Sequence, residues 1–389
     1  MMDRKKRKTR NKRIAVWIVL VAIFEVGLKG LVADEIVIGQ AGAKRTIEGE
    51  ILVEAEDGSL LFRGLDGRLW IIEADELEEK QDDDDPVEPI DEKALGKQLL
   101  AELPEGFRIH IAGDFVIAYD TERGYARWIG GLYQRLRRGF EKYWQRKRFK
   151  LDKPRFPLPV IIFSNKAAYD RYLAAELGNV PGDMVAYYNL LTNRVVMYDL
   201  TDGRRAAGAD PGNSRRISEV LSDPRAIPMV ATVIHEGTHQ LIFNMGMQTR
   251  FAEAPLWLNE GLAMYFETPD LSNSRGWRAI GKVNPIRMTR FRNGLATRPA
   301  DSLRRMISSD DRFRQPGQVL DAYAEAWAFN YFLLNRHADE FVAYLKHMAE
   351  KPRSQYDDPQ TRVSEFRHFF DSDLGQLDRE FVEFMRRAK

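Results

Sequence analysis

The sequence predicts an α+β protein in which a small all-β module precedes a larger region of mixed sheet and helices. Two Asp-Gly dipeptides separate β-rich runs near the N-terminus, and short apolar runs alternate with amphipathic helical patterns from Lys93 onward. Everything after Asp223 has helical periodicity. We therefore expect four parts: a targeting segment (1–33), a β module (34–73), an acidic linker (74–92) and a large domain of strands and helices (93–389).

Composition excludes several functional classes. The 389 residues are 44% hydrophobic and 30% charged, which is typical of a folded globular chain. The formal net charge is only +1, so the chain lacks the overall basic field of a nucleic-acid-binding protein. The sequence contains no cysteine, which excludes disulfide frameworks, thiolate metal ligands and thiol nucleophiles.

Residues 1–33 have the pattern of an export signal. A basic stretch from Arg4 to Arg13 precedes an apolar run from Ile14 to Phe24, which is too short to span a bilayer. Leu31-Val32-Ala33 is a passable small-residue cleavage site, with cleavage before Asp34. Leucine is not ideal three residues before the cleaved bond. We expect a periplasmic, cell-envelope or secreted protein, and an uncleaved membrane anchor over residues 14–33 remains the alternative.

The β module is predicted from its turns. Strand-like runs at 46–55, 59–64 and 68–72 are separated by Asp57-Gly58 and Asp66-Gly67. Asp-Gly is typical of tight hairpins in which both turn positions have φ > 0. The function of this module is not evident from its sequence.

The segment 74–92 is predicted to be a solvated linker. It contains Asp82 to Asp85 and two prolines but almost no apolar residues, so it offers little to bury. Calcium binding is the alternative, but the segment lacks the glycine and the spaced ligands of a calcium loop.

The region from Lys93 onward combines strands and helices. Large apolar residues recur every four positions from Trp128 to Trp144, which predicts an amphipathic helix with a basic face. We interpret that face as solvated, the alternative being contact with an anionic polymer. The other expected elements are strands within 107–119 and at 159–163, a helix at 167–177, a hairpin of 185–189 with 194–198, a mobile loop at 202–216, and helices at 317–336, 338–350, 362–370 and 376–387.

One helix carries the chemistry. Residues 229–243 are predicted to be helical, after Pro228 and before Gly246, and they contain His235-Glu236-Gly237-Thr238-His239. Histidines four residues apart lie on one helix face and can bind a single metal ion. Glu236 lies about 100° around the helix, where it can act as a general base without being a ligand.

A second helix, at 255–267, offers the third ligand that a catalytic zinc site requires. Its Glu260 lies among apolar residues, where a carboxylate is costly unless it is paired or bound to metal. The interval after His239 is long enough for a loop and an antiparallel return. The four remaining histidines, His110, His337, His347 and His368, are interpreted as ordinary polar residues.

The two motifs together resemble the gluzincin zinc metallopeptidases, particularly the zinc aminopeptidases. The shared pattern is His-Glu-x-x-His followed by Trp-Leu-Asn-Glu-Gly-x-Ala-x-Tyr-Phe-Glu. The resemblance implies that Glu260 is the third zinc ligand and that Glu267 orients a zinc-bound histidine. Tyr323 matches a family tyrosine that opens a helix, which implies that it stabilises the oxyanion.

Over residues 36–389 the chain is also similar to a gluzincin-like family of unknown function from planctomycete bacteria. Residues 182–186 lack the glutamate of the Gly-x-Met-Glu-Asn segment with which aminopeptidases bind a free α-amine. Aminopeptidase specificity is therefore not implied. Residues 194–198 are expected to be an edge strand that pairs with an extended peptide.

These features predict an exported zinc-dependent peptidase whose substrate is a peptide or protein and which has no nucleic-acid partner. Its membrane contact would be limited to the N-terminal segment. Two alternatives remain: a catalytically inactive domain that binds peptides or cell-envelope polymers, and a surface interaction protein in which zinc only stabilises the fold.

Overall fold

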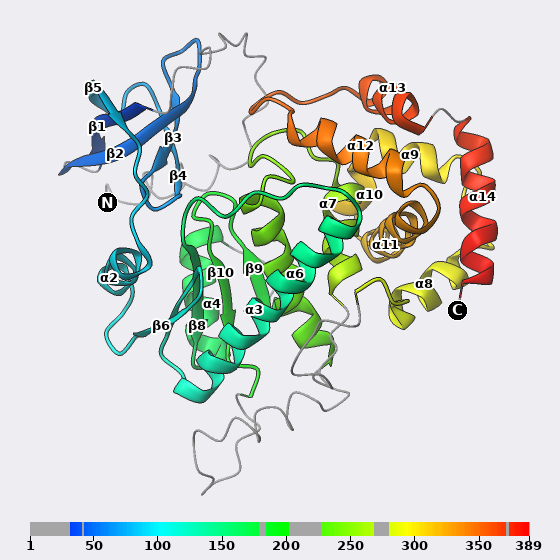
Figure 1. Ribbon diagram of the computed structural model, residues 1–389, viewed down its shortest axis with the longest axis horizontal. Coiled ribbons are helices and arrows are strands. Elements are labelled where there is room, and N and C mark those ends of the chain that lie inside the picture. Colours follow the sequence, from blue (N-terminus) through cyan, green and yellow to red (C-terminus); the bar gives the residue numbers. More distant parts are fainter. Residues whose placement is uncertain are drawn as a thin grey trace, which may run out of the picture.

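The structure is a computed structural model that describes residues 32–40, 43–178, 184–201, 227–267, 280–370 and 373–388. Most of the expected targeting segment (1–31) and the expected mobile loop (202–216) lie outside these ranges. The fold is α+β, as the sequence predicts: an all-β sheet comes first, then a mixed sheet with helices, then a helical C-terminal part (Figure 1). Within the described ranges, no helix combines the length and apolarity needed to cross a bilayer.

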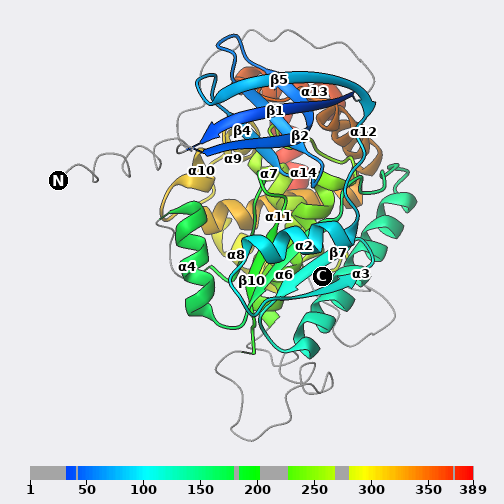
Figure 2. The same cartoon turned by 90° about the vertical axis from the view of Figure 1, so that its left-hand side faces the viewer.

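The first sheet is antiparallel, with strand order β4-β3-β2-β1-β5. Its strands are β1 (Val32–Gln40), β2 (Ala43–Glu54), β3 (Leu60–Gly64), β4 (Leu69–Ile72) and β5 (Leu77–Pro86). Alternate residues such as Ile36 and Ile38, or Leu60 and Phe62, share one face and form a small buried core. This sheet, which we call the β module, lies at one end of the molecule (Figures 1 and 2).

The predicted acidic linker is wrong for residues 77–86, which form the strand β5 along β1. An edge strand is held by backbone hydrogen bonds on one side only, and charged side chains are common on such edges. The small number of apolar side chains in this segment therefore does not prevent it from pairing with β1 as a strand.

The two Asp-Gly turns also differ from the prediction. Gly58 and Gly67 have φ of 83° and 79°, but Asp57 and Asp66 are not in the positive-φ region. In each turn the aspartate side chain instead accepts a hydrogen bond from the backbone N–H two residues later, at 2.9 Å. Each turn thus needs only its glycine to be left-handed.

The second sheet is mixed, with strand order β6-β7-β8-β10-β9. Its strands are β6 (Arg108–Ala112), β7 (Phe115–Tyr119), β8 (Leu158–Phe163), β9 (Ala186–Tyr188) and β10 (Val195–Tyr198). β8 runs parallel to both β7 and β10, whereas β6 and β9 are antiparallel edges. β7, β8 and β10 are buried along their whole length, so both faces of the sheet are covered.

The predicted hairpin of 185–189 with 194–198 is present as β9 and β10, but the expectation that residues 194–198 form an edge is wrong. β10 pairs with β8 on its other side, which leaves β9 as the outer strand. β10 lies inside the sheet because it pairs with β8 on one side and with β9 on the other. β9 is therefore the strand at the edge.

Helices cover both faces of this sheet. They are α2 (Glu92–Glu102), α3 (Arg123–Arg146), α4 (Lys166–Leu177) and α6 (Ile227–Asn244). Gly96 of α2 packs on Ile109, whereas Gly130 of α3 packs on the neighbouring His110. Adjacent strand residues point to opposite faces, so α2 and α3 lie on opposite sides. α6 lies beside α3, because the Tyr133 hydroxyl donates to the Val233 carbonyl at 3.0 Å.

In its described residues, the C-terminal part consists of helices joined by loops and turns. It contains α7 (Leu256–Phe266), α8 (Pro285–Gly294), α9 (Ser302–Ser308), α10 (Asp311–Arg314), α11 (Val319–Arg336), α12 (Ala338–Ala349), α13 (Pro359–Phe370) and α14 (Leu374–Arg387). α7 packs tightly on α11, because a Cβ at Gly261 would lie 1.9 Å from the Asn330 amide nitrogen. That amide donates to the Trp257 carbonyl at 2.9 Å and so holds α7 in a fixed orientation.

Candidate metal centre

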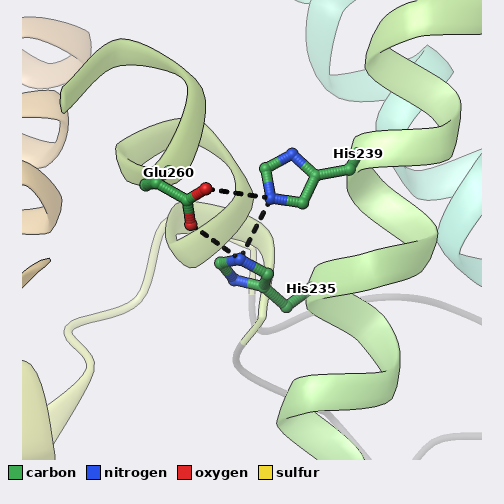
Figure 3. A group of neighbouring side chains, drawn as sticks. All are labelled: His235, His239 and Glu260. Atoms are coloured by element: carbon green, nitrogen blue, oxygen red, sulfur yellow. Dashed lines mark hydrogen bonds and ion pairs between the residues drawn. The ribbon is translucent and has the colours of Figure 1, made fainter. Parts of the chain in front are cut away.

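Two consecutive helices bring three ligand-type side chains together. His235 and His239 lie one turn apart on α6, and Glu260 lies on α7 (Figure 3). The two imidazoles and the carboxylate point toward one another, as Figure 3 shows. Each residue offers one ligand atom, and these atoms lie within 4.8 Å of one another.

The spacing of these atoms matches a single bound ion. His235 Nε2 is 3.1 Å from His239 Nε2 and 3.1 Å from Glu260 Oε2, and His239 Nε2 is 3.6 Å from Glu260 Oε1. Ligands about 2.0–2.1 Å from a tetrahedral ion are separated from each other by about 3.3 Å. The three side chains therefore fit one divalent ion and leave its fourth position open.

The outer nitrogens of both imidazoles are held by acceptors. His235 Nδ1 is 3.2 Å from Glu267 Oε2, and His239 Nδ1 is 3.1 Å from Asn259 Oδ1. Each Nδ1 therefore carries a proton, and each Nε2 turns toward the cluster. An acceptor behind each metal-binding histidine is the usual arrangement in metal sites.

Glu267 is itself anchored by α8. Its Oε1 accepts from Asn284 Nδ2 at 2.9 Å and from Arg287 Nε at 3.3 Å. The side chain of Glu267 is only 7% exposed, so these two donors compensate for the burial of its charge. The first turn of α8 thereby sets the orientation of the His235 ring.

The electrostatics of the cluster favour a positive charge at its centre. Burial lowers the pKa of His235, but the hydrogen bonds to Glu260 and Glu267 outweigh it and raise this pKa to about 10. Burial raises the pKa of Glu260, but the two histidines outweigh it and hold this pKa well below its usual range. These shifts show that the donor set favours a positive charge at its centre, which is the behaviour expected of a metal-binding site.

Glu236 lies beside the cluster and contacts the sheet. Its Oε2 accepts a hydrogen bond from the Tyr188 backbone N–H at 2.8 Å. This N–H points away from β10, because the adjacent Asn189 N–H donates to Arg194 and alternate residues of an antiparallel pair face opposite ways. Burial raises the pKa of Glu236, partly offset by the histidines, so its carboxylate is a better proton acceptor than an exposed one.

Tyr323, in the first turns of α11, lies at the border of this site. Burial raises the pKa of Tyr323, and the negative charges of Glu260 and Glu236 raise it further. Its ring packs against Phe313 at 5.6 Å, and the Arg287 guanidinium lies 5.9 Å from the ring centre. Among the described residues, no hydrogen bond joins the Tyr323 hydroxyl to the three ligands.

The sequence prediction and the structure can be compared residue by residue. The structure brings His235, His239 and Glu260 together and places Glu267 behind His235. It places Tyr323 beside Arg287, which donates to Glu267. Sequence reasoning missed the roles of Asn259, Asn284, Arg287 and the Tyr188 N–H. The other histidines lie apart: His337 and His347, for example, are 3.3 Å from Glu380 and Glu365.

Comparison with known proteins adds one match. A family model described as a protein of unknown function (DUF1570) matches residues 229–354. The matched region extends from the start of α6 to just beyond α12, so it contains all six residues that the sequence analysis assigns to the site. No curated protein matches the chain.

Proposed function

We propose that this protein is a zinc-dependent peptidase of the gluzincin type. The observation that carries the proposal is the convergence of His235, His239 and Glu260 on one point, with Glu236 beside it. Two imidazoles and one carboxylate form a typical donor set for catalytic zinc, and three protein ligands leave a position for water. A structural zinc site normally has four protein ligands, so this arrangement favours a reactive site over a purely structural one.

The chain's own residues supply the proton transfers. A bound zinc ion would lower the pKa of a coordinated water and polarise the scissile carbonyl. Glu236 accepts the proton of the attacking water and delivers it to the nitrogen of the leaving amine as the C–N bond breaks. The hydrogen bond from the Tyr188 N–H holds the Glu236 carboxylate in place for both transfers. The Tyr323 hydroxyl donates a hydrogen bond to the developing oxyanion and keeps its proton.

A peptide substrate agrees with the neighbouring sheet edge. β9 is the outer strand of the mixed sheet, and its outward N–H at Tyr188 reaches the proposed base. Because Glu236 takes the Tyr188 N–H, an extended peptide would add to the other outward backbone groups of β9 and lie with its backbone beside Glu236. Sheet addition recognises the backbone rather than particular side chains, so this feature supports peptides as the substrate class without selecting a sequence.

We also propose that the protein acts outside the cytoplasm. The support is the basic stretch and the apolar run that precede the β module in the sequence. Fractionation of cells that express the full chain tests this. The protein should be found in the envelope or the medium, and a cytosolic location would contradict the proposal.

Cleavage of a mixed peptide library tests the peptidase proposal. The wild-type protein should cleave peptides, a chelator should abolish cleavage, and added zinc should restore it. The Glu236→Gln variant should retain zinc but lose turnover, whereas Glu340→Gln, an exposed residue on α12, should behave as wild type. Tight peptide binding without cleavage would instead favour the catalytically inactive alternative.

A further inference from the structure

A second cluster of charged side chains lies where the β module meets the larger region. The two parts are joined by backbone hydrogen bonds, such as Leu69 N–H to the Leu191 carbonyl at 2.7 Å and Ile90 N–H to the Leu65 carbonyl at 3.0 Å. Arginines from four separate segments converge on this junction, which we call the arginine seam. They are Arg63, Arg155, Arg250 and Arg353.

Aromatic and backbone contacts hold the seam together. The guanidinium groups of Arg63 and Arg155 each lie 5.2 Å from the centre of the Phe156 ring. Gly67 packs directly on that ring, since an added Cβ would lie 2.8 Å from it. Arg250 donates to the Gly67 carbonyl at 2.7 Å.

Arg353 completes the seam from the segment after α12. Its guanidinium donates to the backbone carbonyl of Arg250, and residues 353 and 252 form an isolated antiparallel bridge. All four arginines therefore lie close together: Arg63 and Arg155 contact Phe156. Arg250 contacts Gly67, which packs on Phe156, and Arg353 contacts the Arg250 carbonyl.

Carboxylates do not balance this charge. Glu50, only 3% exposed, accepts from Arg63 at 2.5 Å and from Arg155 at 2.9 Å, both at the same oxygen. Asp66 also acts on Arg250 from nearby, but its oxygens accept from Gln98 and from the Arg68 backbone N–H. Among the residues that the structure describes, four guanidinium groups therefore face two carboxylates.

Arg353 is the member without an acidic partner. Among the described residues, none places a carboxylate oxygen within ion-pair distance of its guanidinium, although its side chain is half-buried. An arginine remains protonated in proteins, and burial of an unpaired charge is costly. Burial lowers the pKa of Arg353 to about 9; the positive charges of Arg63 and Arg250 act in the same direction, and the charge of Glu50 opposes them only in part.

We propose that the arginine seam binds a phosphate-type oxyanion, with Arg353, Arg63 and Arg155 as its donors. Guanidinium groups present planar pairs of N–H donors that match the oxygens of phosphate. The side chains of Arg63 and Arg155 are 17% and 30% exposed, so the anion reaches them from solvent. Arg250 is only 6% exposed and acts as a support through backbone carbonyls. This site shares no residue with the candidate metal centre and does not depend on the proposed peptidase activity.

Thermal unfolding of the full chain tests the proposal through the direction in which phosphate changes the melting temperature. Phosphate should raise the melting temperature of the wild-type protein by about 2–4 °C in a saturable manner, relative to chloride at equal ionic strength. Arg353→Met should lose this rise. In phosphate-free buffer the same variant should melt at or above the wild-type temperature, because it lacks the uncompensated charge.

Controls separate the seam from other anion effects. Arg305→Met removes an exposed arginine that is paired with Asp301, and it should respond to phosphate as wild type. A phosphate effect at the metal centre would survive Arg353→Met and would contradict the proposal, as would the absence of any effect in wild type. If Arg353→Met does not fold, calorimetric titration of the wild type and Arg155→Met with phosphate replaces it, with one phosphate per wild-type chain and weaker binding in the variant.

The source of the anion is determined separately. Sedimentation with phosphatidylglycerol vesicles that depends on Arg353 would identify a lipid headgroup as the natural ligand. Phosphate binding without vesicle binding would identify a free anion. Both results support the oxyanion site, whereas sedimentation that is equal in wild type and Arg353→Met, together with no phosphate effect, refutes it.

Discussion

The charge of His235 provides a quantitative prediction about the ion-free protein. Glu260 and Glu267 lie 3.1 and 3.2 Å from its two ring nitrogens. Burial lowers the pKa of this imidazole, but the two carboxylates outweigh it and raise the pKa from 6.5 to about 10. A proton is therefore bound more tightly in the folded than in the unfolded protein.

The sign of the pH dependence follows from this shift. A raised pKa contributes stability that is fully present below the unfolded value near 6.5 and is lost as the pH rises through about 10. One pKa unit corresponds to about 1.4 kcal/mol. The shift of the His235 pKa from 6.5 to about 10 therefore changes the free energy of unfolding by on the order of 5 kcal/mol. The side chain is 12% exposed, so solvent screens little of this interaction.

The assay is urea denaturation of chelator-treated protein at several pH values between 6 and 10. The free energy of unfolding should fall with pH more steeply in wild type than in His235→Asn, whose amide still donates to Glu267. Subtracting the two curves removes the titration of lysines and tyrosines. Parallel curves for the two proteins would refute the reasoning.

Further predictions concern the proposed metal site and reaction. Glu267→Gln should weaken zinc affinity by about 10–100-fold, measured by competition with a chelating dye, because the acceptor behind His235 loses its charge; an unchanged affinity would contradict this role. Glu260→Ala should weaken zinc binding more than Glu267→Gln does, and equal zinc affinities of this variant and wild type would remove Glu260 from the ligand set. Tyr323→Phe should retain full zinc content but lower kcat by about 10²–10³-fold, and an unchanged kcat would assign Tyr323 to packing alone.

Local periodicity accounts for the part of the site that was predictable from sequence. His235 and His239 share a helix face because four residues are close to one turn, whatever the rest of the fold does. Glu260 needed a further argument, since its position depends on the return of α7 toward α6. Its apolar neighbours and the resemblance to zinc peptidases pointed to it, and tight packing at Gly261 fixes its helix in the structure.

Residues that depend on tertiary packing were not predictable in this way. Asn284 precedes a proline and has the sequence pattern of a helix cap, a role it fulfils by accepting from two backbone N–H groups. Its second contact, to Glu267, arises only because α8 folds back on the end of α7. The contact of the Tyr188 N–H with Glu236 involves a backbone group, so the identity of the residue gives no indication of it. The pairing of β5 was missed for a similar reason, because backbone hydrogen bonds rather than apolar side chains hold that edge strand.

The central claim is that His235, His239 and Glu260 bind one divalent ion. Metal analysis of the purified full-length protein, combined with X-ray absorption at the zinc edge, tests it most directly. We predict one zinc per chain, with nitrogen and oxygen ligands including two imidazoles, and loss of this zinc in the His239→Asn variant. Retention of no metal, or of equal metal in wild type and variant, would contradict the claim.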